Sequence, residues 1–203
     1  MDEPTGAPDG AQRRVALTIG VAVVALAVIV AAAVLVGGGS DEADEFAKGS
    51  VPPRKVGDLD SAVRAAGCSA RDPESEGKAE TSEPVEYRSD PPHSGDHARE
   101  PAPEGAYRSD PPATENIVHA LFHGRIVIWF DPELDESRIG DLKALFDEAP
   151  QHVLLVPRKS MEGEVAATAW RHVLTCPAMT DATFDALRAF RDTWRDQGPE
   201  FVP

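Results

Sequence analysis

An uninterrupted apolar run near the N-terminus constrains this chain more than any other feature. Residues 15–36 (VALTIGVAVVALAVIVAAAVLV) contain no charged side chain. As a helix the run would be about 33 Å long, enough to cross a hydrocarbon core of about 30 Å. A cleaved secretory signal has a shorter apolar core of about 7–15 residues, and no polar stripe marks the run as a buried helix of a globular core. The sequence therefore predicts one retained transmembrane helix over residues 15–36.

The charges beside the run predict its orientation. Arg13 and Arg14 precede it, whereas residues 37–45 carry acids and no base. Three bases between residues 48 and 55 lie slightly further along and reduce this asymmetry. Because basic residues favour the cytoplasmic side, residues 1–14 are expected to form a short cytoplasmic N-terminus, with the C-terminal portion outside the cell membrane.

The portion beyond the run divides into a stalk and a domain. Residues 37–56 lack hydrophobic periodicity and are rich in Gly, Ser, Pro and acids, which is typical of a flexible acidic stalk. Residues 57–203 are expected to form an extracytoplasmic α+β domain with Pro-rich loops. This portion carries nearly all of the net charge of −15, which argues against a nucleic-acid partner. The membrane, through residues 15–36, is the one partner that the sequence indicates.

The domain is predicted to contain about three strands and two to three helices. Strands and helices are distinguished by β-branched or aromatic runs and by apolar stripes at helical spacing. The predicted strands are residues 125–130, 152–156 and 164–176, and the predicted helices are residues 58–67, 137–149 and a final one capped by Thr180 or Asp181. An order that mixes strands and helices in this way favours a small α+β domain.

Cys68 and Cys176 are the only cysteines and both lie on the proposed outer side of the membrane. Disulfides persist in such an oxidising compartment, and two cysteines suffice for one disulfide. The bond would close a loop of about a hundred residues and contribute roughly 4–5 kcal/mol in the chain-entropy model. The alternative is a pair of unrelated free thiols.

Two short stretches hold four of the six histidines: residues 90–97 (DPPHSGDH) and residues 119–124 (HALFHG). His119 and His123 are four residues apart. In a helix their Cα atoms would lie about 6 Å apart, so both rings could bind one ion, whereas a strand would separate them by roughly 13 Å. Both structures fit the pattern; a short helical turn that ends at Gly124 is favoured slightly.

The histidines define a candidate metal site. His97, His119 and His123 are its predicted ligands, and His93 and Asp96 are possible additional ones. Three imidazoles with an open position suit one transition metal ion, zinc or copper, and also iron, because imidazole is not selective. The alternative is that these histidines bind backbone groups of the Pro-rich loops and have a structural role.

Several motifs resemble one protein family. They are PP-x-SG-x-H, then V-H-A-L-x-H-G before an apolar strand, and a final helix closing on F-R-D-x-x-R-D-Q-G-P-E. Together they resemble domain-of-unknown-function family 3105, whose members are bacterial proteins that often have one N-terminal membrane span. The resemblance covers roughly residues 57–203 and implies no established activity.

This chain departs from the family pattern at three positions near the histidines. The pattern has Thr or a similar residue at His93, Pro at Asp96 and Glu at Phe122. Any polar role of that Glu in relatives is therefore in doubt here. The positions that match are His97, His119, His123 and Gly124.

These observations favour a single-pass membrane-anchored protein whose extracytoplasmic domain binds a transition metal through histidine. The first alternative is a non-enzymatic cell-envelope interaction domain with structural histidines. The second is a metal-dependent hydrolase, which needs a general base beside an open metal site; Glu104 and Asp96 are the candidates. The sequence leaves open whether the protein is an enzyme, and it identifies no substrate, protein partner or oligomeric state.

Overall fold

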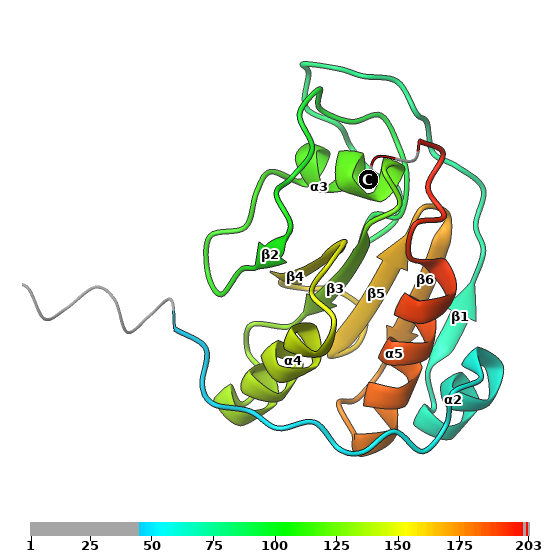
Figure 1. Cartoon of the computed structure of the whole chain (residues 1–203). Helices are drawn as coiled ribbons and strands as arrows, with labels where there is room; N and C mark the ends of the chain where they lie inside the picture. The colour runs from blue at the N-terminus through cyan, green and yellow to red at the C-terminus, as the bar shows by residue number, and fades with distance from the viewer. Residues whose placement is uncertain (1–44, 201, 203) are drawn as a thin grey trace, which may run out of the picture. The chain divides into compact units, whose positions relative to one another are not determined.

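The computed structural model describes residues 45–200 and residue 202. This part of the chain is an α+β fold with a six-stranded sheet and four helices (Figure 1). The predicted α+β class is therefore confirmed. The predicted transmembrane helix, residues 15–36, lies outside the described residues, and among the described ones no helix has the length and apolar character needed to cross a bilayer.

The sheet mixes parallel and antiparallel pairs in the order β1-β6-β5-β3-β4-β2. β3 and β4 are parallel and are joined through helix α4, the crossover that a parallel pair requires; β2 is also parallel to β4, and the other pairs are antiparallel. The strands are β1 (Ser69–Arg71), β2 (Gly105–Ala106), β3 (Ile126–Phe130), β4 (Val153–Pro157), β5 (Val165–Ala169) and β6 (His172–Cys176).

Six strands replace the three predicted, for two physical reasons. The predicted strand over residues 164–176 is a hairpin, in which Ala169 opposes His172 across a tight turn. Arg171 adopts a left-handed φ of 67° at this turn, where Gly or Asn would have marked it in the sequence. β1 and β2 are only three and two residues long and are ordered by pairing with β6 and β4, so no local pattern revealed them.

The helices follow local signals that the sequence carries. Asp58 caps α2 by accepting a hydrogen bond from the Ser61 backbone N–H at 2.9 Å, and Gly67 ends it with a left-handed φ of 65°. Thr180 and Thr183 form a capping box at the start of α5. The bounds are α2 (Leu59–Ala66), α3 (Thr114–Phe122), α4 (Glu136–Glu148) and α5 (Asp181–Trp194).

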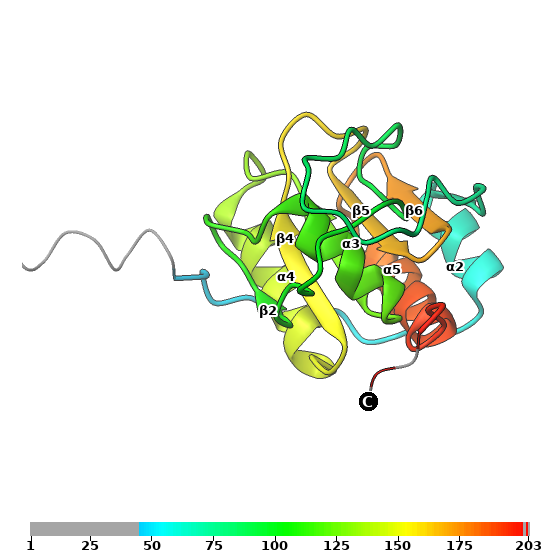
Figure 2. The same cartoon turned by 90° about the horizontal axis from the view of Figure 1, so that it is seen from above.

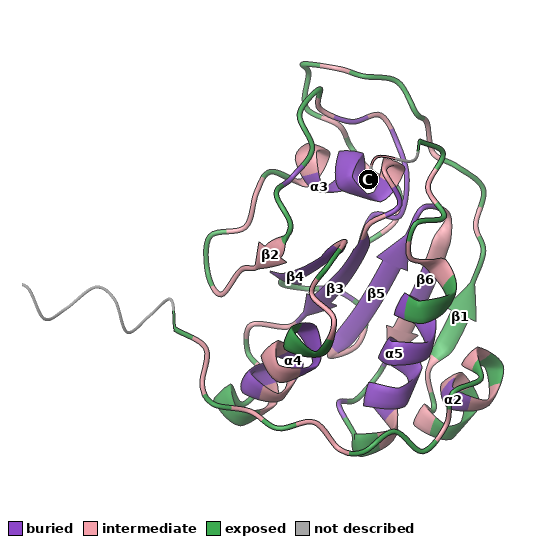
Figure 3. Cartoon of the chain, viewed as in Figure 1, coloured by how far each residue is buried: buried purple, intermediate pink, exposed green. Residues whose placement is uncertain are grey.

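Helices cover both faces of the sheet, so the central strands are buried (Figure 3). On β3, Ile126 and Ile128 pack in the core that contains residues of α2, α4 and α5. The alternate residues, Val127 and Trp129, pack in a second core with apolar residues of α3. This alternation follows from the two-residue period of a strand. It places α3, which carries two of the histidines, over the opposite face from α4 and α5.

A disulfide joins Cys68 to Cys176, which confirms the predicted bond. Cys68 lies between α2 and β1, and Cys176 is the last residue of β6 and is fully buried. The bond therefore attaches α2 and the edge strand β1 to the end of the central hairpin. Within the described residues there is no free cysteine.

Residues 45–56, the last part of the predicted stalk, form an extended strap that runs past α4 and α5 towards α2 (Figures 1 and 2). The Ser50 backbone N–H donates to Asp141 Oδ1 at 2.9 Å. Gly49 lies directly against Gly140 of α4, where an added Cβ would be 2.0 Å from the Gly140 carbonyl carbon. Backbone hydrogen bonds and close packing thus hold the strap on the helices.

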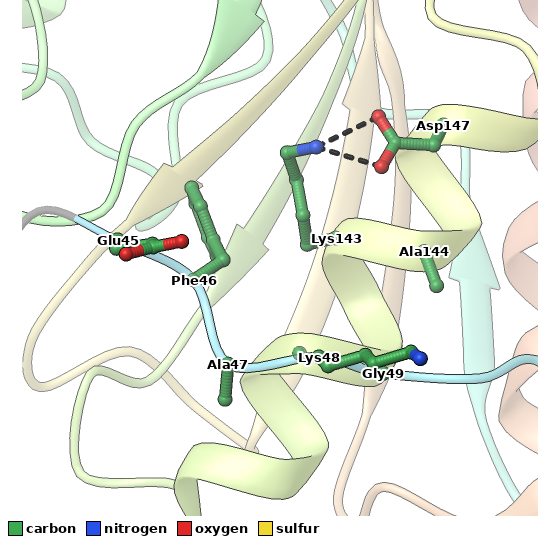
Figure 4. Close-up of a pocket in the computed structure, with 9 residues that line it drawn as sticks. Glu45, Phe46, Ala47, Lys48, Gly49, Lys143, Ala144 and Asp147 are labelled. Atoms are coloured by element: carbon green, nitrogen blue, oxygen red, sulfur yellow. Dashed lines mark hydrogen bonds and ion pairs between the residues drawn. The ribbon is translucent and has the colours of Figure 1, made fainter.

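A cavity of about 450 Å³ lies between the start of this strap and α4 (Figure 4). Lys143 spans it and donates to both carboxylate oxygens of Asp147, at 2.8 and 2.7 Å. Its ammonium group also lies 5.8 Å from the centre of the Phe46 ring. Lys143 and Asp147, two of the charged residues that line this cavity, are therefore paired with each other.

Candidate functional site

Helix α3 places His119 and His123 side by side. Of the two structures that the sequence allowed for residues 119–123, the helical one is therefore correct. His119 lies inside the helix and His123 caps its C-terminus, with the His123 N–H donating to the His119 carbonyl at 3.1 Å. Gly124 then leaves the helix with a left-handed φ of 81°. The two Nε2 atoms are 3.0 Å apart and the ring centres 4.3 Å apart. One turn of helix thus brings the two side chains into contact.

The hydrogen bonds of His119 define its tautomer. Its Nδ1 lies 2.7 Å from the carbonyl oxygen of Ala98, and a carbonyl only accepts, so Nδ1 carries the proton. In the neutral ring the Nε2 atom is then an acceptor, and its lone pair faces Nε2 of His123. A hydrogen bond between the two Nε2 atoms, 3.0 Å apart, therefore requires the proton to be on Nε2 of His123.

Aromatic rings enclose the pair on one side. The His97 ring centre is 4.7 Å from that of His119 and 4.8 Å from that of Phe122. Trp170 packs edge-on against Phe122 with ring centres 5.1 Å apart. His97 is only 2% exposed, and its Nδ1 donates to the Gly95 carbonyl at 3.0 Å. His97 therefore stands beside the pair as part of its buried wall.

Burial keeps both histidines of the pair neutral. Desolvation is the largest cause that lowers the pKa of His119 and of His123 below the ordinary value. The positive charge that His119 would carry lowers the pKa of His123 further, while Glu200 raises both in part. At neutral pH both rings are therefore uncharged, and an uncharged imidazole is the form that binds metal ions.

We expect the metal-free protein to lose stability as the pH falls below about 6.5. The unfolded chain binds protons near the ordinary histidine pKa, whereas folded His119 and His123 bind them only at lower pH. The unfolded state then holds more protons, so the free energy of unfolding decreases with decreasing pH. Urea unfolding at pH 7.5 and pH 5.5, in buffer with a chelator, measures the change. A His119→Gln/His123→Gln variant should show a weaker pH dependence; an identical dependence would refute this assignment.

The described part of the C-terminal segment, residues 195–200 and residue 202, packs over the end of α3. Gly198 lies against Gly124, where a Cβ on Gly198 would be 2.2 Å from the Gly124 nitrogen. The Glu200 N–H donates to the Phe122 carbonyl at 3.2 Å, and Glu200 Oε2 lies 3.6 Å from His123 Nε2. Sequence reasoning missed Glu200, because 77 residues separate it from His123 and no short motif contains both.

His93 has different partners from the pair, although the sequence places it in the same stretch as His97. It is 1% exposed, and its Nε2 lies 3.4 Å from Glu76 Oε1. Its Nδ1 is 2.9 Å from Ser94 Oγ, which also accepts a hydrogen bond from the Glu76 N–H at 3.0 Å. Burial lowers the pKa of His93, and Glu76 opposes this in part. Ser94 is fully buried, so this arrangement holds a loop and presents no nucleophile to solvent.

Asp96 and Glu104, the candidate general bases, both have structural partners. Asp96 Oδ1 accepts hydrogen bonds from two successive backbone N–H groups, at residues 78 and 79, at 3.0 and 2.9 Å. Glu104 Oε1 accepts from Arg125 Nε at 3.0 Å, and its Oε2 accepts from the His152 N–H at 2.9 Å. Each carboxylate therefore holds loop segments together.

The structure thus brings together His119 and His123 from the predicted metal set, with His97 beside them. In the described part of the chain, no group of three or more His, Cys, Asp or Glu side chains is already arranged to hold a metal ion. The three-histidine site stays a prediction. The arrangement that the structure does contain is a converging pair of imidazoles with one nearby carboxylate.

Comparison with known proteins supports the family resemblance. A family model described as "Protein of unknown function (DUF3105)" matches residues 78–201. This is more than half of the chain; it includes the histidine stretches and Glu200, but begins later than the residue 57 expected from the motifs. No curated protein and no solved structure matches the chain. The chain therefore belongs to the DUF3105 family, whose function is unknown.

Proposed function

We propose that this is a single-pass membrane-anchored protein whose extracytoplasmic domain binds one transition metal ion, zinc or copper, at His119 and His123. The apolar run of residues 15–36 supports the anchor, and the arginines before it support an outer location for the domain. The Cys68–Cys176 disulfide is compatible with an oxidising compartment.

The observation that carries the metal proposal is the 3.0 Å approach of the two Nε2 atoms. Two nitrogens bound to a tetrahedral zinc ion at about 2.0–2.1 Å are about 3.3 Å apart. His119 and His123 therefore need to separate by only a few tenths of an ångström to admit an ion. Binding of an ion at this point would require the His123 tautomer that carries its proton on Nδ1, so that the Nε2 lone pairs of both rings face the ion.

The surroundings of His119 also support the proposal. Metal-binding histidines usually donate their second ring N–H to a backbone carbonyl or carboxylate, which fixes the tautomer and the ring orientation. The hydrogen bond from His119 Nδ1 to the Ala98 carbonyl has this form, and His119 is 6% exposed. Its orientation is therefore set before any ion binds.

We expect the purified full-length protein to bind one ion per chain. It is first stripped with a chelator and then titrated with Zn²⁺, or with Cu⁺ under anaerobic conditions in the presence of a weak copper chelator. His119→Gln and His123→Gln should each weaken binding by about 100-fold or more, because each substitution removes a direct ligand. Loss of a residue that only hydrogen-bonds to a ligand already lowers metal affinity by about 10–100-fold. Isothermal titration and elemental analysis measure affinity and stoichiometry.

His172→Gln is the matched control for these variants. The His172 ring stacks on Trp194 with centres 3.4 Å apart, and its Nδ1 pairs with Asp72 at 2.6 Å, away from α3. Its substitution should leave the affinity unchanged. If the wild-type protein binds neither ion in stoichiometric amount, the metal proposal is wrong.

A second candidate function is a cell-envelope interaction domain in which the histidines are structural. Two hydrogen bonds favour it. The one from His97 Nδ1 to the Gly95 carbonyl lies within the Pro-rich loop, and the one from His119 Nδ1 to the Ala98 carbonyl joins this loop to α3. On this hypothesis His119→Gln would lower stability in metal-free buffer and no ion would bind. A hydrolase has weaker support, since Asp96 and Glu104 are occupied in loop contacts; it would require turnover that His123→Gln abolishes.

A further inference from the structure

We infer that Glu200 is the third protein ligand of the ion, supplied by the C-terminal segment after α5. This inference rests on the proposed function at His119 and His123, because it names the group that would complete that site. Glu200 lies outside both histidine stretches, and its carboxylate is beside His123 only because the chain returns to the end of α3.

Backbone contacts fix the path of this segment. The Asp196 N–H donates to the Gly124 carbonyl at 2.8 Å, two residues before Gly198 makes its close contact with the same glycine. Further along, Arg125 Nη1 donates to the carbonyl of Val202 at 2.6 Å. Glu200 lies between these anchors, so its backbone position is determined by contacts that do not involve its side chain.

The carboxylate stands at the distance expected between two ligands of one ion. Its Oε2 is 3.6 Å from His123 Nε2, compared with the separation of about 3.3 Å around tetrahedral zinc. The Glu200 side chain is 58% exposed, whereas that of His123 is 13% exposed. Glu200 can therefore rotate towards an ion at the histidine pair without disturbing the core, which explains how a third donor joins when none is arranged beforehand.

The chemistry of this set favours a divalent ion. Two imidazoles and a carboxylate form the His₂Glu donor set that binds zinc, with a fourth position for water or an external ligand. Two neutral imidazoles do not compensate the charge of a divalent ion. The Glu200 carboxylate would neutralise one of its two positive charges. Softer ligands select Cu⁺, so an oxygen from Glu200 strengthens Zn²⁺ binding and adds little for Cu⁺.

The experiment titrates the full-length protein with Zn²⁺, and separately with Cu⁺, in four forms: wild type, Glu200→Gln, Glu162→Gln and His123→Gln. Glu162 is an exposed carboxylate on another loop and serves as the control. We expect Glu200→Gln to weaken Zn²⁺ binding by about 10–100-fold and Cu⁺ binding by less than about threefold. X-ray absorption of the zinc-loaded protein should show the loss of one protein oxygen ligand in this variant.

The outcomes separate the two proposals. If His123→Gln abolishes binding while Glu200→Gln and Glu162→Gln both match the wild type, Glu200 is not a ligand and the proposed function stands. If the wild type binds no ion, the proposed function fails and this inference fails with it. Because Glu200 is exposed, its amide variant should unfold at the same temperature as the wild type, so a loss of affinity would not reflect misfolding.

Discussion

Reduction of the Cys68–Cys176 disulfide is expected to lower the free energy of unfolding by about 4–5 kcal/mol. The bond joins residues 108 apart in the sequence, and the chain-entropy model gives a loop of this length about that value. A natural domain has only about 5–15 kcal/mol of stability in total. The reduced protein should therefore unfold at much lower urea concentration, with α2 and β1 released from the end of β6.

Urea unfolding with and without a thiol reductant measures this effect. Because Cys176 is fully buried, the genetic counterpart is Cys68→Ala/Cys176→Ala, which avoids placing an unsatisfied hydroxyl in the core. The double variant should be about as stable as the reduced wild type, and a reductant should not change it further. A loss below about 1 kcal/mol in both cases would show that the crosslink is not a major source of stability.

The elements that the sequence predicts correctly are those with a local physical signal. α4 and α5 have apolar stripes at helical spacing, and Ile139, Leu142 and Phe184 are fully buried as those stripes predict. β3 is a run of β-branched and aromatic residues that is buried on both faces. Elements that depend on distant partners, such as the two-residue strand β2, carry no such signal.

The candidate site shows the same division. The spacing of His119 and His123, with Gly124 after them, correctly favours a helical turn, because helix geometry and the left-handed glycine are local properties. The contacts of Ala98 and Glu200 with this pair depend on how two other segments fold back over α3. No pattern in one sequence specifies such contacts.

His93 and His97 show that proximity in the sequence does not give two side chains a common partner. His93 and His97 are four residues apart, yet each ring has its own partner: Glu76 for His93, and the Gly95 carbonyl for His97. Gly95 lies between them with a left-handed φ of 142°, a conformation that side-chain-bearing residues rarely adopt. In an extended, glycine-containing loop, a four-residue spacing does not bring side chains to one point.

Removing Arg188 is expected to destabilise the protein by about 3 kcal/mol, because it leaves buried charge without a partner. Arg188 is 5% exposed and donates to both carboxylate oxygens of Glu148, at 2.8 and 2.6 Å. It also donates to the carbonyl of Pro52 in the strap at 3.0 Å and lies 3.4 Å from Asp185. One guanidinium thus links α4, α5 and the strap.

Asp185 accounts for most of this cost, because it is 5% exposed while the Glu148 side chain is 36% exposed and screened by solvent. Asp185 Oδ2 accepts the N–H groups of Lys55 and Val56 at 3.0 and 2.9 Å, so it cannot turn towards water without releasing the strap. Arg188→Met therefore leaves an unpaired buried carboxylate at the point where the strap is held.

Urea unfolding of Arg188→Met measures the loss, with Arg138→Met as the matched control. Arg138 pairs with Asp141 at 3.5 Å on the surface of α4 and is 39% exposed, so its removal should cost less than about 1 kcal/mol. Adding Asp185→Asn to Arg188→Met should recover part of the stability, because the amide oxygen still accepts the strap N–H groups without a charge. If the double variant is less stable than Arg188→Met alone, the unpaired charge of Asp185 is not the main cause of the stability loss.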